Sequence, residues 1–273
     1  MRRVAHLSDL HFGRVDQTLV GPLIEVVNAL KPDLVAVSGD LTQRARSSQF
    51  RQARDFLKSL PGPQVIVPGN HDVPLHNVFA RLTDPLEKYR RYITDDLRPF
   101  YLDDEIALLG VNTARSLTIK GGRINLDQVK WMREKLCQVR SDVVKIVVTH
   151  HPFDVPEGFD DRVVAGGSRR AMLALAECGA DLFLAGHLHV GQIGHATARF
   201  KISGYRALVV QAGTASSTRG RGEANSFNLI SIHHPQITIE RYQWTPELKA
   251  FTGVSSERFA HSPTGWQRVS SAG

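Results

Sequence analysis

Side chains that commonly bind metals follow five apolar stretches of the sequence, each at the point where the stretch ends. In chain order they are Asp9 and His11 in SDLH, Asp40 in SGD, Asn70, His71 and Asp72 in PGNHD, His150 and His151 in VVTHHP, and His187 and His189 in AGHLH. Any one of these motifs also fits a turn, a helix cap or a buried structural histidine. Five in succession do not fit that explanation, because the carboxyl ends of strands in open α/β sheets form the crevice where ligands bind. We therefore predict that the five motifs meet in one pocket.

The residue types in this pocket indicate a pair of metal ions. Imidazole and carboxylate ligands without cysteine suit zinc, iron or manganese and argue against a structural zinc site. Two such ions about 3.5–4 Å apart need a bridging anion, and they activate water and polarise a phosphoryl group. Asp40 can supply the bridge, and a histidine outside the ligand set can protonate a leaving oxygen. The chemistry predicted is metal-assisted hydrolysis of a phosphoester.

Hydrophobic periodicity indicates the elements that must position these residues. Short apolar runs predict strands over 4–9, 33–40, 64–70, 106–112, 143–151 and 181–189. Helical spacing of apolar residues predicts helices over 19–30, 50–57, 74–98, 126–139 and 168–178. Three further strands without intervening helices follow over 207–213, 227–233 and 236–244. This order predicts an α/β fold, a four-layer αββα sandwich of two mixed β-sheets flanked by helices.

The same pattern predicts one domain over residues 1–245, with a helical insertion over 74–98 that caps the pocket. Residues 246–273 are polar and serine-rich and are predicted to form an arm or tail.

Composition excludes several classes of protein. The 273 residues are 42% apolar and 22% charged, as in ordinary globular proteins, and no apolar run approaches the length of a membrane span. The N-terminus lacks the apolar core of a signal peptide, so we expect a cytoplasmic protein. The net charge of +7 is not concentrated in a basic stripe, so nucleic acid is not an expected partner. Cys137 and Cys178 form no CxxC motif and are expected to be reduced and packed near the core.

The series DLH, GD, GNHD, THHP and GHLH, in this order and spacing over residues 5–190, resembles the calcineurin-like metallophosphoesterases. Within that family the chain is most similar to the bacterial class III cyclic-nucleotide phosphodiesterases and the related glycerophosphodiesterases, which share its length and the helical insertion after GNHD. The resemblance implies a sandwich of two mixed sheets and two metal ions, with manganese, iron and zinc as the candidates. Some relatives are dimers, which leaves a homodimer open.

Roles follow from the resemblance residue by residue. One metal is held by Asp9, His11 and His189, the other is held by Asn70, His150 and His187, and Asp40 bridges the two. His71 contacts the phosphate and assists the leaving group, with Asp72 orienting it. The implied reaction is attack by a metal-bound hydroxide on the phosphorus of a small phosphodiester such as a 3′,5′-cyclic nucleotide.

The alternative functions share either the hydrolytic chemistry or only the fold with this reaction. Glycerophosphodiesters, nucleotide-sugar lipids and phosphomonoesters are other substrate classes, and a non-catalytic binding scaffold is the alternative of another kind. Gln43 stands in GDLTQRA where the Ser/Thr protein phosphatases of the superfamily have an acid, so protein phosphatase activity is not expected.

Further substrate contacts rest on position alone. Asn112 and Arg115 lie at the end of the strand over 106–112 and are predicted to contact the substrate, with a turn and a surface arginine as the alternative. Arg219 and Arg221 lie in a loop rich in glycine and serine over 213–223, and they either meet an anionic group or belong to a solvated loop.

Overall fold

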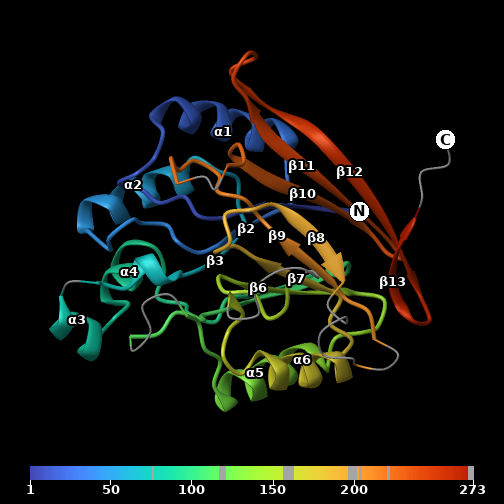
Figure 1. The fold of residues 1–273 in the computed structure, drawn as a ribbon. Helices are drawn as coiled ribbons and strands as arrows, with labels where there is room; N and C mark the ends of the chain where they lie inside the picture. The colour runs from blue at the N-terminus through green and yellow to red at the C-terminus, as the bar shows by residue number, and fades with distance from the viewer. Residues whose placement is uncertain are drawn as a thin grey trace.

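Two mixed β-sheets lie face to face between two layers of helices (Figure 1). The computed structural model describes residues 1–75, 77–116, 121–155, 163–195, 202, 205–219 and 222–269. The first sheet has seven strands in the order β13-β12-β11-β10-β1-β2-β3. Their bounds are β1 Arg2–Leu7, β2 Leu34–Ser38, β3 Gln64–Val67, β10 Ser226–His233, β11 Gln236–Thr245, β12 Ala250–Ser262 and β13 Gly265–Val269. Strands β1 to β3 are parallel, and the other pairings are antiparallel.

The second sheet has six strands in the order β4-β5-β6-β7-β9-β8. Their bounds are β4 Phe100–Leu102, β5 Ile106–Val111, β6 Val144–Thr149, β7 Leu182–Ala185, β8 Gln192–His195 and β9 Leu208–Gln211. The four central strands are parallel, and β4 and β8 pair antiparallel at the two edges. The predicted fold, two mixed sheets flanked by helices, is confirmed.

Helices cover the outer face of each sheet (Figure 1). The helices are α1 Gln17–Leu30, α2 Ser47–Lys58, α3 Val78–Thr83, α4 Glu87–Tyr92, α5 Leu126–Leu136 and α6 Ser168–Glu177, with a short 3-10 turn at Asn70–Asp72. Strand β2 illustrates the layers, because Val35 and Val37 face the helical layer while Leu34 and Ala36 face the second sheet. No helix in the described part of the chain is long and apolar enough to cross a bilayer.

Several segments differ from the elements that periodicity predicts. The insertion over 74–98 contains two short helices, α3 and α4, rather than one continuous helix. Residues 250–269, for which we expect an arm or tail, form β12 and β13 at the edge of the first sheet. Strands β4 and β8 have only three and four residues, too few to produce a recognisable alternation.

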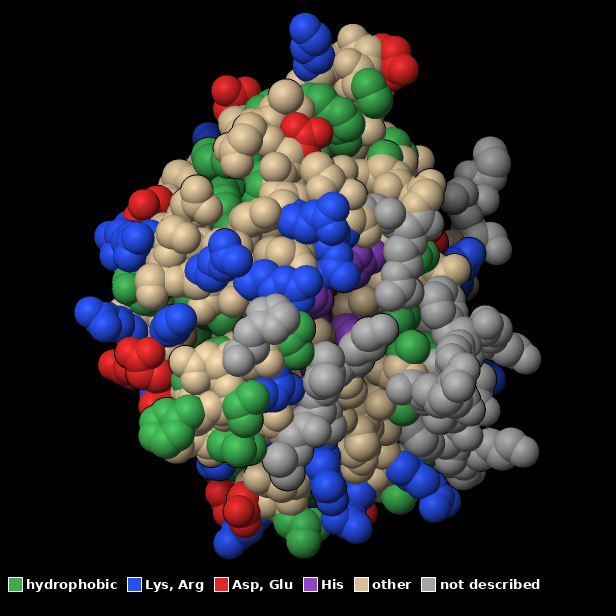
Figure 2. Space-filling model, turned by 60° about the vertical axis from the view of Figure 1, so that its left-hand side comes forward, with side chains coloured by type: hydrophobic (Ala, Val, Ile, Leu, Met, Phe, Trp, Pro, Cys, Tyr) green, Lys and Arg blue, Asp and Glu red, His purple; other side chains and the backbone are tan. Residues whose placement is uncertain are grey.

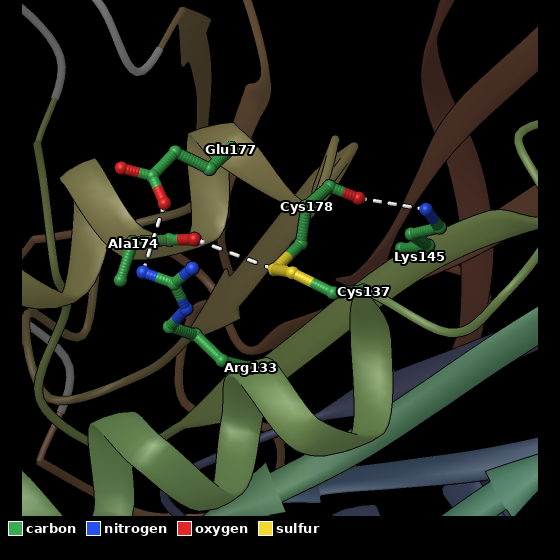
Figure 3. Close-up of a disulfide and its surroundings, with 6 residues drawn as sticks. All are labelled: Arg133, Cys137, Lys145, Ala174, Glu177 and Cys178. Atoms are coloured by element: carbon green, nitrogen blue, oxygen red, sulfur yellow. Dashed lines mark hydrogen bonds and ion pairs between the residues drawn. A yellow bond between two sulfur atoms is a disulfide. The ribbon is translucent and has the colours of Figure 1, made fainter.

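The two cysteines form a disulfide, so the expectation of reduced cysteines is wrong (Figure 3). Cys137 and Cys178 are the C-cap residues of α5 and α6, and their Cα atoms lie 4.4 Å apart. The two helices cover the same face of the second sheet, and Arg133 of α5 pairs with Glu177 of α6 at 2.8 Å beside the disulfide. Two helix ends that are 41 residues apart in the chain meet only after the helices have packed, which spacing in the sequence does not reveal.

Candidate metal centre

All seven predicted ligands lie just beyond the carboxyl ends of strands. The loops after β1, β2 and β3 carry those of the first sheet, and the loops after β6 and β7 carry those of the second. Five of the seven have positive φ angles, at Asp9 (54°), His11 (50°), Asp40 (53°), His187 (71°) and His189 (59°). This left-handed conformation costs a residue with a Cβ roughly 1–2 kcal/mol. Such strain gathers at functional sites, where the surrounding structure holds it in place.

Two glycines allow the ligand loops to approach one another. A Cβ on Gly69 would lie 2.1 Å from Asp40 Oδ1, and a Cβ on Gly186 would lie 2.5 Å from Asp9 Oδ2. Each glycine immediately precedes a predicted ligand, Asn70 or His187. Only a residue without a side chain fits at these two positions.

The first group of ligands contains Asp9, His11, Asp40 and His189, whose ligand atoms all lie within 4.8 Å of one another. Asp9 Oδ2 accepts hydrogen bonds from Ser8 Oγ and the His187 backbone N–H. The other oxygen, Asp9 Oδ1, is buried, makes no hydrogen bond and faces Nε2 of His11 at 3.6 Å and Nε2 of His189 at 3.1 Å.

The second group contains His150, His151 and His187, again within 4.8 Å, and Asn70 joins it through Oδ1, which lies 3.1 Å from Nε2 of His150. His150 Nδ1 lies 2.8 Å from the carbonyl oxygen of Ser38. Because a carbonyl only accepts, Nδ1 carries the proton, and the lone pair of Nε2 points into the site. His151 is a member of this group that the sequence indicates only as a neighbour of His150.

Asp40 lies between the two groups. Its Oδ2 faces Nε2 of His11 at 3.6 Å, and its Oδ1 faces Nε2 of His150 at 3.4 Å. A carboxylate whose two oxygens face two separate sets of imidazoles has the placement required of a bridging ligand. The resemblance implies this bridging role for Asp40, which stays a prediction.

The buried charges of the site call for cations. Burial raises the pKa of Asp40 well above its usual range, and the charges of Asp9 and Asp72 add to this effect. Burial also raises the pKa of Asp9, but the imidazoles of His11 and His189 outweigh it and hold that pKa well below its usual range. Burial lowers the pKa of His150 to about 4, so its ring is neutral at pH 7. Lone pairs and carboxylates that face one another with few protons between them fit a site for two divalent ions.

His71 is fixed at both ring nitrogens. Nδ1 lies 2.9 Å from the carbonyl oxygen of Gln43, so Nδ1 carries the proton, and Nε2 accepts a hydrogen bond from Nη1 of Arg219 at 2.8 Å. Burial, together with the neighbouring His11, lowers the pKa of His71 to about 4. In this arrangement the neutral ring is a hydrogen-bond acceptor at Nε2, and its donor is Arg219.

Asp72, predicted to orient His71, acts on the backbone instead. Its two oxygens accept hydrogen bonds from the N–H groups of Leu41, Thr42 and Gly69 and from Thr42 Oγ1, at 2.9–3.1 Å. These bonds join the loop that carries Asp40 to the loop that carries Asn70 and His71. The carbonyl of Gln43, rather than the carboxylate of Asp72, holds the imidazole.

A cavity of about 250 Å³ opens beside these groups. Its lining consists of Arg14, Gln43, Arg44, Asn70, His71, Val73, Leu75, Arg81 and Arg219. Figure 2 shows histidine side chains at the bottom of a hollow, with Lys and Arg side chains gathered along one side. The cavity thus brings a metal ligand, His71 and four guanidinium groups together.

Comparison with known proteins agrees with this geometry. The family model for calcineurin-like phosphoesterases matches residues 2–191. The chain belongs to this family. It is therefore a metal-dependent phosphoesterase, as the five motifs predict.

Curated relatives of this phosphoesterase are phosphodiesterases at low identity. The chain is 28% identical over 255 residues to a cAMP/cGMP dual specificity phosphodiesterase of Mycobacterium tuberculosis, covering 84% of this chain and 75% of the relative. It is 26% identical over 185 residues to a glycerophosphodiester phosphodiesterase of Enterobacter lignolyticus, covering 64% of this chain and 65% of the relative.

A solved structure shares the fold. A dimetal phosphatase from Danio rerio has a TM-score of 0.67 at 14% identity, covering 96% of this chain and 99% of that one. At this identity the likeness concerns the fold alone.

Two predicted substrate contacts of the phosphoesterase lie outside the cavity lining. Asn112 Oδ1 accepts a hydrogen bond from the Ala114 N–H and closes a local turn. Arg115 donates to Gln128 Oε1 and lines a separate hollow with Arg123 and Arg170. The position after a strand end is therefore not enough to bring a side chain to the metal ligands.

Arg219 lies in the site, which resolves one of the alternatives left open by the sequence. Besides its bond to His71, its carbonyl oxygen lies 3.0 Å from Nδ1 of His189. The sequence gives no reason to prefer Arg219 over Arg221 as a site residue. Arg221 lies outside the described residues. The signal that could have found Arg219 is its position in the loop after the strand predicted over 207–213, which the structure shows as β9, parallel to β7.

Proposed function

We propose that the chain hydrolyses small phosphodiesters, such as 3′,5′-cyclic nucleotides, at a dinuclear metal centre. The observation that carries this proposal is the placement of Asp40, whose two oxygens face Nε2 of His11 and Nε2 of His150 at 3.6 and 3.4 Å. A single carboxylate between two groups of imidazoles serves two ions, and two ions are the arrangement that suits displacement at phosphorus.

The ligands divide as the resemblance implies. Asp9, His11 and His189 would hold one ion, Asn70, His150 and His187 would hold the other, and Asp40 would bridge them. Manganese, iron and zinc all accept this set of nitrogen and oxygen donors. When bound, the ions supply Lewis-acid polarisation of the phosphoryl group and lower the pKa of water to near neutrality.

The residues on the cavity wall position the ester and the departing group. Asn70 connects the second ligand group to the cavity. The neutral ring of His71 holds the guanidinium of Arg219 in place, and Arg219 can donate to an ester oxygen without being deprotonated. We assign to this pair the hydrogen bond to the leaving oxygen. Arg219 donates that bond, and His71 orients the guanidinium of Arg219.

The size and cover of the cavity favour a small substrate. A volume of about 250 Å³ is at the low end for ligand pockets. Leu75 and Arg81 from the 74–98 segment line it, which supports a role for that segment as a cap on the pocket.

The substrate class rests on the relatives. The Mycobacterium relative is named for cAMP and cGMP, and the Enterobacter relative for glycerophosphodiesters. We place cyclic nucleotides first, because the similarity to the Mycobacterium protein extends over more of the chain. Glycerophosphodiesters are the second candidate.

The test is a panel of esters with the metal content measured in parallel. Protein loaded with Mn²⁺ is assayed on cAMP, glycerophosphocholine, bis-p-nitrophenyl phosphate and p-nitrophenyl phosphate. We expect two ions per chain and higher kcat/KM on the diesters than on the monoester. Two bound ions with no turnover of any of these esters would refute the proposal and favour a binding scaffold.

Variants separate metal binding from turnover. Asp40→Ala should lose both metal and activity, whereas His71→Ala should lose activity with little loss of metal. His233→Ala, at the exposed last residue of β10, is the matched control and should change neither. Metal loss in His71→Ala as large as in Asp40→Ala would contradict the roles given to these residues.

A further inference from the structure

Three arginines form a cationic wall on the cavity beside His71. Arg14, Arg44 and Arg219, which we call the arginine rim, come from the loops that follow β1, β2 and β9. The loops after β1 and β2 also carry the predicted ligands Asp9, His11 and Asp40. Two of the three arginines therefore share a loop with a predicted metal ligand. A cluster of this kind recognises phosphate or carboxylate groups.

The rim is held in place by backbone hydrogen bonds between its three loops. The N–H of Phe12 donates to the carbonyl of Leu41, and the N–H of Gln43 donates back to the carbonyl of Phe12, at 2.9 Å each. The N–H of Thr218 donates to the carbonyl of Arg14, also at 2.9 Å. The backbone positions of the three arginines are thus fixed relative to one another and to the ligands.

The rim carries positive charge that its surroundings do not balance. Within the described residues, the cavity lining contains four arginines and no acidic side chain. Burial lowers the pKa of Arg219, and repulsion from Arg14 and Arg44 acts in the same direction, while the buried Asp40 and Asp9 oppose it. Those two carboxylates are already engaged with the imidazoles, and within the part of the chain that the structure describes no acidic side chain shares the cavity lining with Arg14 and Arg44.

The cavity offers little for recognition of a nucleobase. Apart from His71, no aromatic residue lines it within the described residues, so it provides no stacking surface of the kind that holds bases. Charge is the dominant feature by which this wall can select a ligand.

A simple phosphodiester carries one negative charge, which a pair of divalent ions already balances. We propose that Arg14 and Arg44 of the arginine rim bind a second phosphate group of the substrate, so that phosphodiesters with a further phosphate are preferred over those without one. This inference rests on the proposed phosphodiesterase function and narrows its substrate class, because it ranks diesters with a second phosphate above simple 3′,5′-cyclic nucleotides and glycerophosphodiesters, which have only one.

The test compares two chromogenic diesters that differ by one phosphate. These are thymidine 5′-(p-nitrophenyl phosphate) and its 3′-phosphorylated counterpart, thymidine 3′-phosphate 5′-(p-nitrophenyl phosphate). In both, water adds to phosphorus and the bond to the p-nitrophenyl oxygen breaks, releasing p-nitrophenol. We expect kcat/KM to be higher for the 3′-phosphorylated ester by roughly ten- to hundredfold, the effect of one or two charge-assisted hydrogen bonds.

The double variant Arg14→Ala/Arg44→Ala should bring this ratio close to one, and it leaves Arg219 and its contact with His71 in place. The matched control is Arg54→Ala/Arg140→Ala, which removes the same charge from a half-buried and an exposed arginine that pair with Asp55 and Asp142 outside the cavity. The control should keep the ratio of the wild-type protein.

Calorimetry supplies a readout that does not depend on turnover. Thymidine 3′,5′-bisphosphate should bind the Mn²⁺-loaded protein more tightly than thymidine 5′-monophosphate by a similar factor, and the rim variant should abolish the difference. Equal values for the two members of each pair, or a difference that survives in the rim variant, would overturn the inference. Failure to hydrolyse either ester would instead count against the proposed function, because the binding comparison would still report on the rim.

Discussion

Reduction of the disulfide between Cys137 and Cys178 should lower the stability of the protein by a predictable amount. The bond joins residues 41 apart in the sequence. In the loop-entropy model, closing a loop of this length lowers the entropy of the unfolded chain and raises its free energy by about 4 kcal/mol at 25 °C. A chain of 273 residues has an unfolding entropy of roughly 0.57 kcal/mol/K near its midpoint, so the corresponding shift is ~7 °C in Tm.

The cleanest perturbation is chemical reduction rather than mutation. Cys178 is 5% exposed, so a smaller residue there would add the cost of a cavity. Cys137 is exposed, which gives a reductant access to the bond. Scanning calorimetry at fixed metal concentration, with and without a phosphine reductant, measures Tm, and thiol titration confirms that two thiols have formed.

Two outcomes decide the matter. A Tm lowered by about 7 °C, with the Cys137→Ala variant insensitive to the reductant, is the expected result. Two titrated thiols with a Tm change below about 1 °C would refute the reasoning, because the entropy restricted by the cross-link scales with the loop it closes.

Three further predictions concern the site and the core. Gly69→Ala should lose bound metal at unchanged circular dichroism, because the new Cβ would lie 2.1 Å from Asp40 Oδ1; retention of two ions per chain by elemental analysis would contradict this. Asp72→Asn should lower the urea unfolding free energy by about 2 kcal/mol at pH 7. The amide nitrogen that replaces one carboxylate oxygen cannot accept, so buried N–H groups that donate to that oxygen lose their partner at about 1–3 kcal/mol each. Burial lowers the pKa of His6 to about 3, so the unfolded chain binds a proton more readily below pH 6.5 and stability falls as the pH decreases. Between pH 8 and pH 5 this costs about 2 kcal/mol, and His6→Gln should lose that much less over the same range; equal losses in denaturant titrations would rule it out.

Local patterns in the sequence were enough to predict the layers of the fold and to place the candidate ligands at strand ends. The alternation in β2 separates the side chains that face the helices from those that face the second sheet, and this periodicity is visible without any partner. The motif residues follow strand ends, and the carboxyl ends of parallel strands meet at one edge. Asp9, Asp40 and His150 could therefore be grouped without knowledge of their distances.

Only the tertiary structure decided which distant groups touch. Arg219 reaches His71 across 148 positions of the chain, and Cys137 pairs with Cys178 across 41. Arg115, at an equally suggestive strand end, faces a different hollow. A repeating apolar pattern involves only residues that are close in the chain. The sequence alone therefore indicates most of the helices and strands, and it shows that the candidate ligands follow strand ends. Contact between two side chains depends on how whole elements pack, and no local pattern in this chain encodes it.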